Sequence, residues 1–235
     1  YGISLRPLST FAGHIYPDEQ PIKAAERAIT MMMFKLEGQL IRRNPDFQMD
    51  SRLLLDKLDF RSSYAVLGDG RRYELESAYF PTIDESMADP YLLTSKEQEI
   101  IEDLKSYFVE STVLQRHVDY LYQRGSLYTR YNGNLLFHGC VLLAEDGSLR
   151  TVNYAGRSYR GRQWFDFCDR MAREAWLHGG REALDFMYFL WCGRISPVSG
   201  REFKTFERAL IPDESTWKEP SDPYYTYINE AETCA

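Results

Sequence analysis

The stretch of sequence that is most informative about the fold is Tyr131-Asn132-Gly133-Asn134-Leu135-Leu136-Phe137-His138-Gly139-Cys140. Its turn pair, Asn132-Gly133, precedes a short apolar run whose length and flanks predict a buried strand. His138 ends the run, and Gly139 lets other groups approach the backbone closely. Because ligands bind at strand ends in α/β sheets and a neutral imidazole suits a metal ion, His138 is a candidate metal ligand.

Further elements are predicted downstream of this stretch. Residues 145–148 read Glu-Asp-Gly-Ser between two apolar segments, which indicates a turn. The apolar periodicity of residues 162–177 predicts an amphipathic helix, and the glycine pair at 179–180 is its stop signal.

The upstream half is mainly helical in pattern. A long helix begins at Pro21 and stops at Asn44-Pro45. A capping-box signal at Thr94 opens one long helix, or two in series, that ends near Gly125. Between them, Gly68-Asp69-Gly70 separates two short strand patterns, and a hairpin turn is favoured over a metal site at Asp69.

The composition is that of an ordinary globular protein. The chain has 235 residues, of which 44% are hydrophobic and 27% charged, with a net charge of −7. These values suit one large domain or two small ones and exclude a collagen, a coiled coil and wholesale disorder. The acidic balance argues against nucleic acid and anionic lipid as partners.

We expect a cytoplasmic protein with no membrane partner. The four cysteines are widely spaced, and the sequence has no apolar run of about 20 residues.

The other three histidines are assigned structural roles. His14 has no partner nearby in the sequence, and His117 lies on the solvated face of a helical pattern. His178 lies beside the glycine pair at a helix end, where a partly charged imidazole meets the helix dipole favourably.

Residues 131–140 resemble the class III fructose-1,6-bisphosphatases of bacteria, which are calcineurin-like metallophosphoesterases. Other strings resemble the same family in the same order: YGISLRPLSTFA at 1–12, FPTID at 80–84, LWCG at 190–193, KTFER at 204–208 and DPYY at 222–225. The resemblance implies a mixed α/β fold. Residues 1–123 would be a mainly helical insertion or linking region with a small hairpin, and 124–235 the second half of a phosphoesterase sandwich.

The resemblance also implies a reaction. Fructose 1,6-bisphosphate would be hydrolysed to fructose 6-phosphate and phosphate, a step of gluconeogenesis, by water activated on a pair of Mn²⁺ or Mg²⁺ ions. His138 would be one ligand of that pair. Phosphate groups also require positive partners, and Arg157, Arg160 and Arg162 rank highest because they lie between a strand pattern and a helix start. The other basic candidates are Arg124, Arg130 and Lys204.

Most metal motifs of the superfamily are missing from these 235 residues. The sequence contains no D-x-H, G-D-x-x-D-R-G or G-N-H-D, and only the later H-G motif is present, at His138-Gly139. We therefore expect an internal piece of a longer enzyme. Because one histidine cannot hold a binuclear centre, the isolated chain is predicted to be inactive.

Two other functions remain open. The chain could be a non-catalytic interaction or regulatory domain that retains phosphoesterase-like strands, and the gene sequence upstream of Tyr1 would discriminate this from the enzyme. A nucleic-acid binder using the basic and aromatic residues 150–170 conflicts with the net charge of −7. For the enzyme we expect a sugar bisphosphate as the small-molecule partner, and a homo-oligomer.

Overall fold

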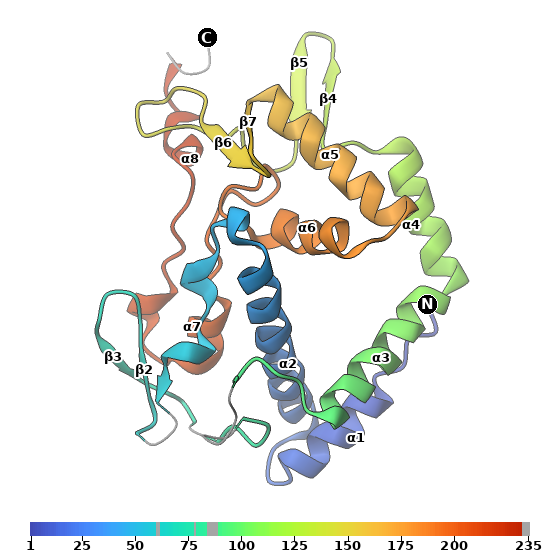
Figure 1. Cartoon of the computed structure of the whole chain (residues 1–235), viewed down its shortest axis with the longest axis vertical. Helices are drawn as coiled ribbons and strands as arrows, with labels where there is room; N and C mark the ends of the chain where they lie inside the picture. Colours follow the sequence, from blue (N-terminus) through green and yellow to red (C-terminus); the bar gives the residue numbers. More distant parts are fainter. Residues whose placement is uncertain (60–61, 78, 84–88, 232–235) are drawn as a thin grey trace. The chain divides into compact units, whose positions relative to one another are not determined.

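A computed structural model describes residues 1–59, 62–77, 79–83 and 89–231 (Figure 1). Asp84 and Cys234 lie outside the described residues. The chain divides into two compact units. The first unit comprises Tyr1–Arg43, Ser51–Arg124 and Leu210–Asp213, and the second comprises Asn44–Asp50, Gly125–Ala209 and Glu214–Ala235.

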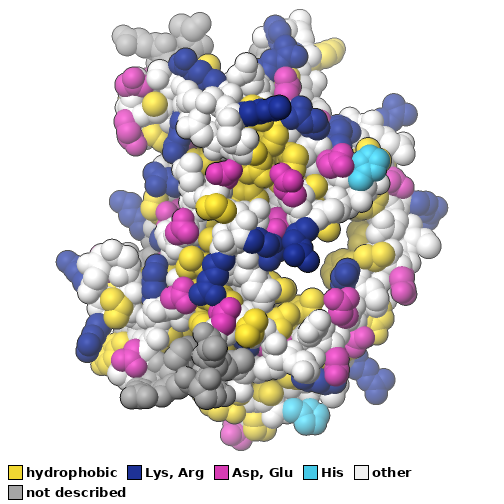
Figure 2. All heavy atoms as spheres, in the orientation of Figure 1, with side chains coloured by type: hydrophobic (Ala, Val, Ile, Leu, Met, Phe, Trp, Pro, Cys, Tyr) yellow, Lys and Arg dark blue, Asp and Glu magenta, His cyan; other side chains and the backbone are white. Residues whose placement is uncertain are grey.

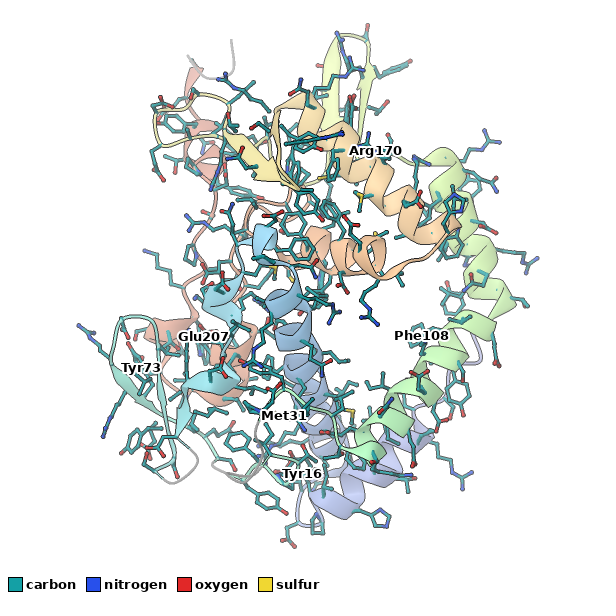
Figure 3. The ribbon with its side chains drawn as sticks, viewed as in Figure 1. Tyr16, Met31, Tyr73, Phe108, Arg170 and Glu207 are labelled. Carbon is teal, nitrogen blue, oxygen red and sulfur yellow. The ribbon has the colours of Figure 1, made fainter. Side chains whose placement is uncertain are left out.

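The first unit is built on helices. Its helices are α1 (Arg6–Ile15), α2 (Pro21–Arg43), α3 (Ser95–Glu110) and α4 (Thr112–Arg124). As predicted, α2 begins at Pro21 and ends before Asn44-Pro45, since the residue before a proline disfavours the helical conformation. Helices α1, α2 and α3 share one apolar core, which contains Leu8, Phe11, Ala12, Tyr16, Ala24, Ala28, Met32, Ile100 and Leu104. Figure 3 labels Tyr16 at the end of α1.

The capping box predicted at Thr94 is confirmed. The Glu97 backbone N–H donates to Thr94 Oγ1 at 3.2 Å, and the Thr94 N–H donates to Glu97 Oε2 at 2.8 Å. Of the two alternatives for the segment that follows, two helices in series is correct. Ser111 separates them, and its hydroxyl accepts from the Leu114 N–H at 3.4 Å, which caps the second helix.

A buried ion pair joins α2 to the start of α3. Lys35 Nζ lies 2.7 Å from Glu97 Oε2 and donates to the Thr82 carbonyl at 2.8 Å. The Lys35 and Glu97 side chains are 0% and 1% exposed. Burial lowers the pKa of Lys35, while its bond to Glu97 opposes that change.

A small antiparallel sheet completes the first unit. It contains β1 (Leu58–Asp59), β2 (Tyr64–Val66) and β3 (Arg72–Glu74) in that order. The turn between β2 and β3 is the predicted one, with Gly70 at φ +76°. Three 3₁₀ turns flank the sheet and the end of α2: η1 (Pro45–Phe47, in the second unit), η2 (Asp50–Arg52) and η3 (Leu55–Lys57).

The second unit combines two hairpins with helices. The hairpins are β4 (Tyr128–Tyr131) with β5 (Asn134–Phe137), and β6 (Thr151–Tyr154) with β7 (Arg157–Arg160). The other elements are α5 (Arg162–Leu177), α6 (Arg181–Cys192), α7 (Thr205–Leu210), η4 (Glu214–Trp217) and α8 (Tyr224–Tyr227). Its core is a cluster of aromatic rings in mutual contact: Phe47, Tyr154, Trp164, Phe167, Phe186 and Phe189.

The prediction of a buried strand at residues 134–137 is wrong in one respect. The strand forms, but among the described residues it pairs with β4 alone, and Leu135 and Leu136 are 47% and 52% exposed. A two-stranded hairpin buries little surface by itself, and among the four residues of β5 only Phe137 is partly buried.

The mixed helix and strand class is confirmed. Each named strand pair among the described residues is antiparallel and belongs to a small sheet. The assignment of 1–123 and 124–235 to parts of a phosphoesterase sandwich stays a prediction.

Candidate functional site

His138 lies in a bend directly after β5, with its side chain exposed. The residue before it, Phe137, anchors the end of the strand. The Phe137 ring contacts those of Phe165 and Tyr224, at centroid distances of 5.9 and 6.0 Å. The imidazole is therefore presented to solvent from a strand end whose last residue is fixed by packing.

Gly139 allows the close backbone approach that the sequence predicted. A Cβ at this position would lie 2.3 Å from the carbonyl oxygens of Pro197 and Val198. The next residue, Cys140, donates its backbone N–H to the Pro197 carbonyl at 2.9 Å. The segment after His138 is thus held against residues 197–198 by contacts that only glycine permits.

A buried carboxylate, Asp222, holds the same segment from another direction. Asp222 Oδ1 accepts the backbone N–H of Leu143 at 2.9 Å and that of Tyr224 at 3.0 Å. Its own N–H donates to the Gly200 carbonyl at 2.8 Å, and Arg150 Nη1 lies 4.0 Å from its Oδ2. Asp222 therefore ties the loop that follows His138 to the chain before α8.

Cys140 lies beside the contacts of Asp222, but its buried thiol is unreactive. Its side chain is fully buried, and burial raises the pKa of the thiol to about 12. The nearby Asp222 carboxylate raises the pKa further. Because nucleophilic attack and metal binding require the thiolate, Cys140 packs as a small apolar residue.

The donor groups near His138 do not fit a metal pair. In residues 1–59, 62–77, 79–83 and 89–231, no three His, Cys, Asp or Glu side chains gather in a group that could hold a metal ion. A binuclear site needs several such ligands on each ion. His138 thus belongs to no such group in the part of the chain that the structure describes.

The structure does not bring the three favoured arginines together. Arg157 and Arg160 are exposed, and their odd spacing on β7 places their side chains on opposite faces of the hairpin. Arg162 begins α5, where its Nε lies 3.3 Å from Asp166 Oδ2. Of the remaining candidates, Arg124 ends α4 in the first unit, and Lys204 is paired with Glu202 and Glu207.

Arg162 instead lines a pocket of about 420 Å³ in the second unit. The pocket lies between the β4–β5 hairpin, the segment after it and the start of α5. Its walls combine two arginines with an apolar surface: Arg130, Arg162, Leu135, Val141, Leu149 and Phe165. Basic side chains gather beside apolar atoms over the hairpin and α5 in Figure 2.

Sequence reasoning missed the pairing of Arg130 with Arg162. A signal was present, because the Asn132-Gly133 turn fixes the register of the hairpin. That register pairs Arg130 with Leu135 and Tyr128 with Phe137, so the four side chains share one face. Which face of the hairpin meets α5 depends on tertiary packing, and the sequence carries no such signal.

The other three histidines have local contacts or exposed positions, and His14 has a partner that the sequence did not predict. His14 Nδ1 is 2.7 Å from the Thr10 carbonyl, one turn earlier in α1. His117 is exposed on α4, as predicted, and its Nδ1 is 3.0 Å from the Tyr1 hydroxyl. His178 is the C-cap of α5.

A family model described as Firmicute fructose-1,6-bisphosphatase matches residues 1–235. The chain belongs to the Firmicute fructose-1,6-bisphosphatase family. Its relatives include the class 3 fructose-1,6-bisphosphatase of Clostridium tetani, which is 42% identical over 259 residues. The enzymes of the same name from Clostridium botulinum strains Langeland and Okra are 38% identical over 259 residues.

The alignments cover the full length of this chain but only part of the length of each relative. The alignments include 100% of this chain and 38–39% of each of these three relatives, so the chain spans about two fifths of their length. No solved structure matches the chain. Among the described residues, no helix has the length and apolar character that crossing a bilayer requires.

Proposed function

We propose that this chain is one portion of a fructose-1,6-bisphosphatase, which hydrolyses fructose 1,6-bisphosphate to fructose 6-phosphate and phosphate. The observation that carries the proposal is the family match over all 235 residues, together with 42% identity to the Clostridium tetani class 3 enzyme. Alignment over the whole chain places every element of both units in the comparison, so the proposal does not depend on one motif.

The chain's own contribution to the reaction centres on His138. Ring packing on Phe137 fixes the strand end before it. The contacts of Gly139 and Asp222 fix the segment after it. Because the backbone on both sides of His138 is fixed, its position loses little conformational entropy when the imidazole takes up a ligand, which favours a metal ligand. Mn²⁺ or Mg²⁺ is the cofactor we propose for the longer protein.

We propose that the remaining ligands come from other parts of the longer protein, because no three His, Cys, Asp or Glu side chains among the described residues form a group that could hold a metal ion. We therefore propose that the isolated chain does not hydrolyse the sugar bisphosphate. The calcineurin-like sandwich, the homo-oligomer, a place in gluconeogenesis and a cytoplasmic location belong to the same proposal for the longer protein.

A segment exchange tests this function. The matching portion of the Clostridium tetani enzyme is replaced by residues 1–235, and phosphate release from fructose 1,6-bisphosphate is measured with Mn²⁺. The chimera is expected to be active. His138→Ala in the chimera should lower kcat/KM by about 100-fold or more. His178→Ala, which alters an exposed histidine at a helix end, is the matched control and should change kcat/KM less than twofold.

Two outcomes would contradict the proposal. A folded chimera without activity would show that this chain cannot replace the enzyme segment, and full activity of the His138→Ala chimera would remove the role of His138. The lack of a metal-binding group among the described residues also favours a second function, a non-catalytic interaction or regulatory domain. An inactive but folded chimera would support that alternative.

A further inference from the structure

The pocket beside β5 has the composition of a ligand site rather than of a packing defect. Its volume of about 420 Å³ lies within the range of small-molecule sites. Leu135, Val141, Leu149 and Phe165 form an apolar wall, and two arginines, Arg130 and Arg162, also line the pocket. Ligand sites typically combine such a wall with a small number of charged groups.

Arg130 is the uncompensated charge in this pocket. Arg162 shares Asp166 with Tyr128, whose hydroxyl donates to Asp166 Oδ1 at 2.7 Å. No ion pair includes Arg130 within the described residues, and the cross-strand neighbour of Arg130 is the apolar Leu135. The pocket lining contains two arginines and no acidic residue, and the one ion pair that the described residues form with either arginine is Arg162–Asp166, so the pocket carries an excess of positive charge and favours a dianion.

The apolar wall restricts what such an anion can carry. Leu135, Val141, Leu149 and Phe165 offer no side-chain hydrogen bonds to a hydroxyl-rich body, and the Tyr128 hydroxyl is already engaged with Asp166. Sugar hydroxyls buried against this wall would lose their bonds to water without replacement. An apolar organic group would gain by leaving water.

We propose that this pocket binds a phosphate monoester with an apolar organic group, with the phosphate at Arg130 and Arg162 and the organic group on the Leu135–Phe165 side. This ligand is chemically distinct from the sugar bisphosphate of the proposed reaction. The inference does not depend on hydrolysis, because every residue that carries it lies in the second unit of this chain.

Calorimetric titration of the full 235-residue chain with phenyl phosphate tests the proposal. Saturable binding with one site is expected. Arg130→Gln and Arg162→Gln should each weaken it about tenfold, and the double variant should abolish it. Arg157→Gln removes an exposed arginine of β7 that does not line the pocket, so it is the matched control and should change the dissociation constant less than twofold.

Three further ligands separate the contribution of the phosphate charge to binding from that of the apolar group. Phenol lacks the charge and inorganic phosphate lacks the apolar group, and both should bind at least about tenfold more weakly than phenyl phosphate. Fructose 6-phosphate is expected to bind as weakly as phenol and inorganic phosphate. The backbone amide signals of Gly133 and Gly161, which line the pocket, should shift during the phenyl phosphate titration and report its location without any substitution.

Several results would overturn the proposal. These are no saturable binding of phenyl phosphate, unchanged binding in the folded double variant, or amide shifts that omit Gly133 and Gly161. Equal affinity for fructose 6-phosphate or fructose 1,6-bisphosphate would also overturn it and would assign the pocket to a sugar phosphate. Failure of the segment exchange, in contrast, would leave these binding results unaffected.

Discussion

Gly139 occupies a position where any side chain would collide with rigid backbone. An added Cβ would lie 2.3 Å from two carbonyl oxygens, at Pro197 and Val198, and neither atom belongs to a flexible side chain. Gly139→Ala is expected to lower the free energy of unfolding by about 2 kcal/mol or more, measured by urea denaturation. Gly68→Ala is the control, because a Cβ there meets open space, and its effect should stay within about 0.5 kcal/mol. Equal stability of both variants would contradict this account of the turn.

Asp69 is a turn residue whose acid titration can be followed directly. Its Oδ2 accepts from the Tyr73 hydroxyl at 2.7 Å and its Oδ1 from the Arg71 N–H at 3.0 Å. The Tyr73 bond is the main cause that lowers the pKa of Asp69 below its ordinary value of 3.8. Figure 3 labels Tyr73 on the hairpin.

The folded-state pKa of Asp69 is therefore lower than the unfolded-state value. Its contribution to stability is present above about pH 3.8 and is lost as the pH falls through the lower folded-state pKa. Tyr73→Phe should raise the pKa of Asp69 toward 3.8, as measured by carbon-13 NMR of the carboxyl group. Asp146, whose pKa is lowered by its bond to the Ser148 N–H, serves as the internal control and should not respond.

At the scale of elements, the contact between α2 and α3 depends on the buried Lys35–Glu97 pair. Removing one partner leaves an uncompensated charge in the interior. Lys35→Met is expected to lower the free energy of unfolding by about 3 kcal/mol or more. Glu97→Gln retains an acceptor for the capping box but loses the negative charge.

A double-mutant cycle decides whether the pair acts as a unit. Lys35→Met combined with Glu97→Gln should destabilise by clearly less than the sum of the single variants, because the orphaned charge is removed together with its partner. Additive effects would mean that the two side chains stabilise the fold independently. The measurement is equilibrium unfolding of the four proteins under one condition.

Helix α4 forms although none of its side chains is buried. Its 13 residues include no buried side chain, while Tyr120 and Leu121 are 63% and 64% exposed. Ser111 caps its start. Local capping and helical propensity therefore define this helix, since tertiary burial among the described residues contributes little to it.

At the scale of the whole chain, the grouping of donors determines what can be bound. No three His, Cys, Asp or Glu side chains among the described residues form a group that could hold a metal ion, so we expect the 235-residue chain to bind Mn²⁺ no more tightly than about 1 mM. Electron paramagnetic resonance of free Mn²⁺ during a protein titration measures this. His138→Ala should give the same curve. Stoichiometric binding of two ions that requires His138 would contradict the expectation.

Much of the local structure was predictable because its causes lie within a few residues. The stop of α2 at Asn44-Pro45, the capping box at Thr94 and the turn at Gly68–Gly70 all follow from side-chain chemistry at fixed spacing. The need for glycine at 139 followed from the same kind of reasoning. The family resemblance seen in residues 131–140 likewise extends across the whole chain.

The sequence by itself determined the long helix from Pro21, the helical segment from Thr94, the helix at 162–177, the capping box at Thr94, the turn at Gly68–Gly70 and the family. The tertiary structure alone decided that β5 is exposed, that Lys35 and Glu97 are buried together, and that Arg130 rather than Arg157 accompanies Arg162. The physical reason is the separation along the sequence over which each interaction acts. Propensity, capping and alternation act between near neighbours, whereas burial and the meeting of two charges about 30 residues apart depend on which surfaces pack, and many packings satisfy the same local pattern.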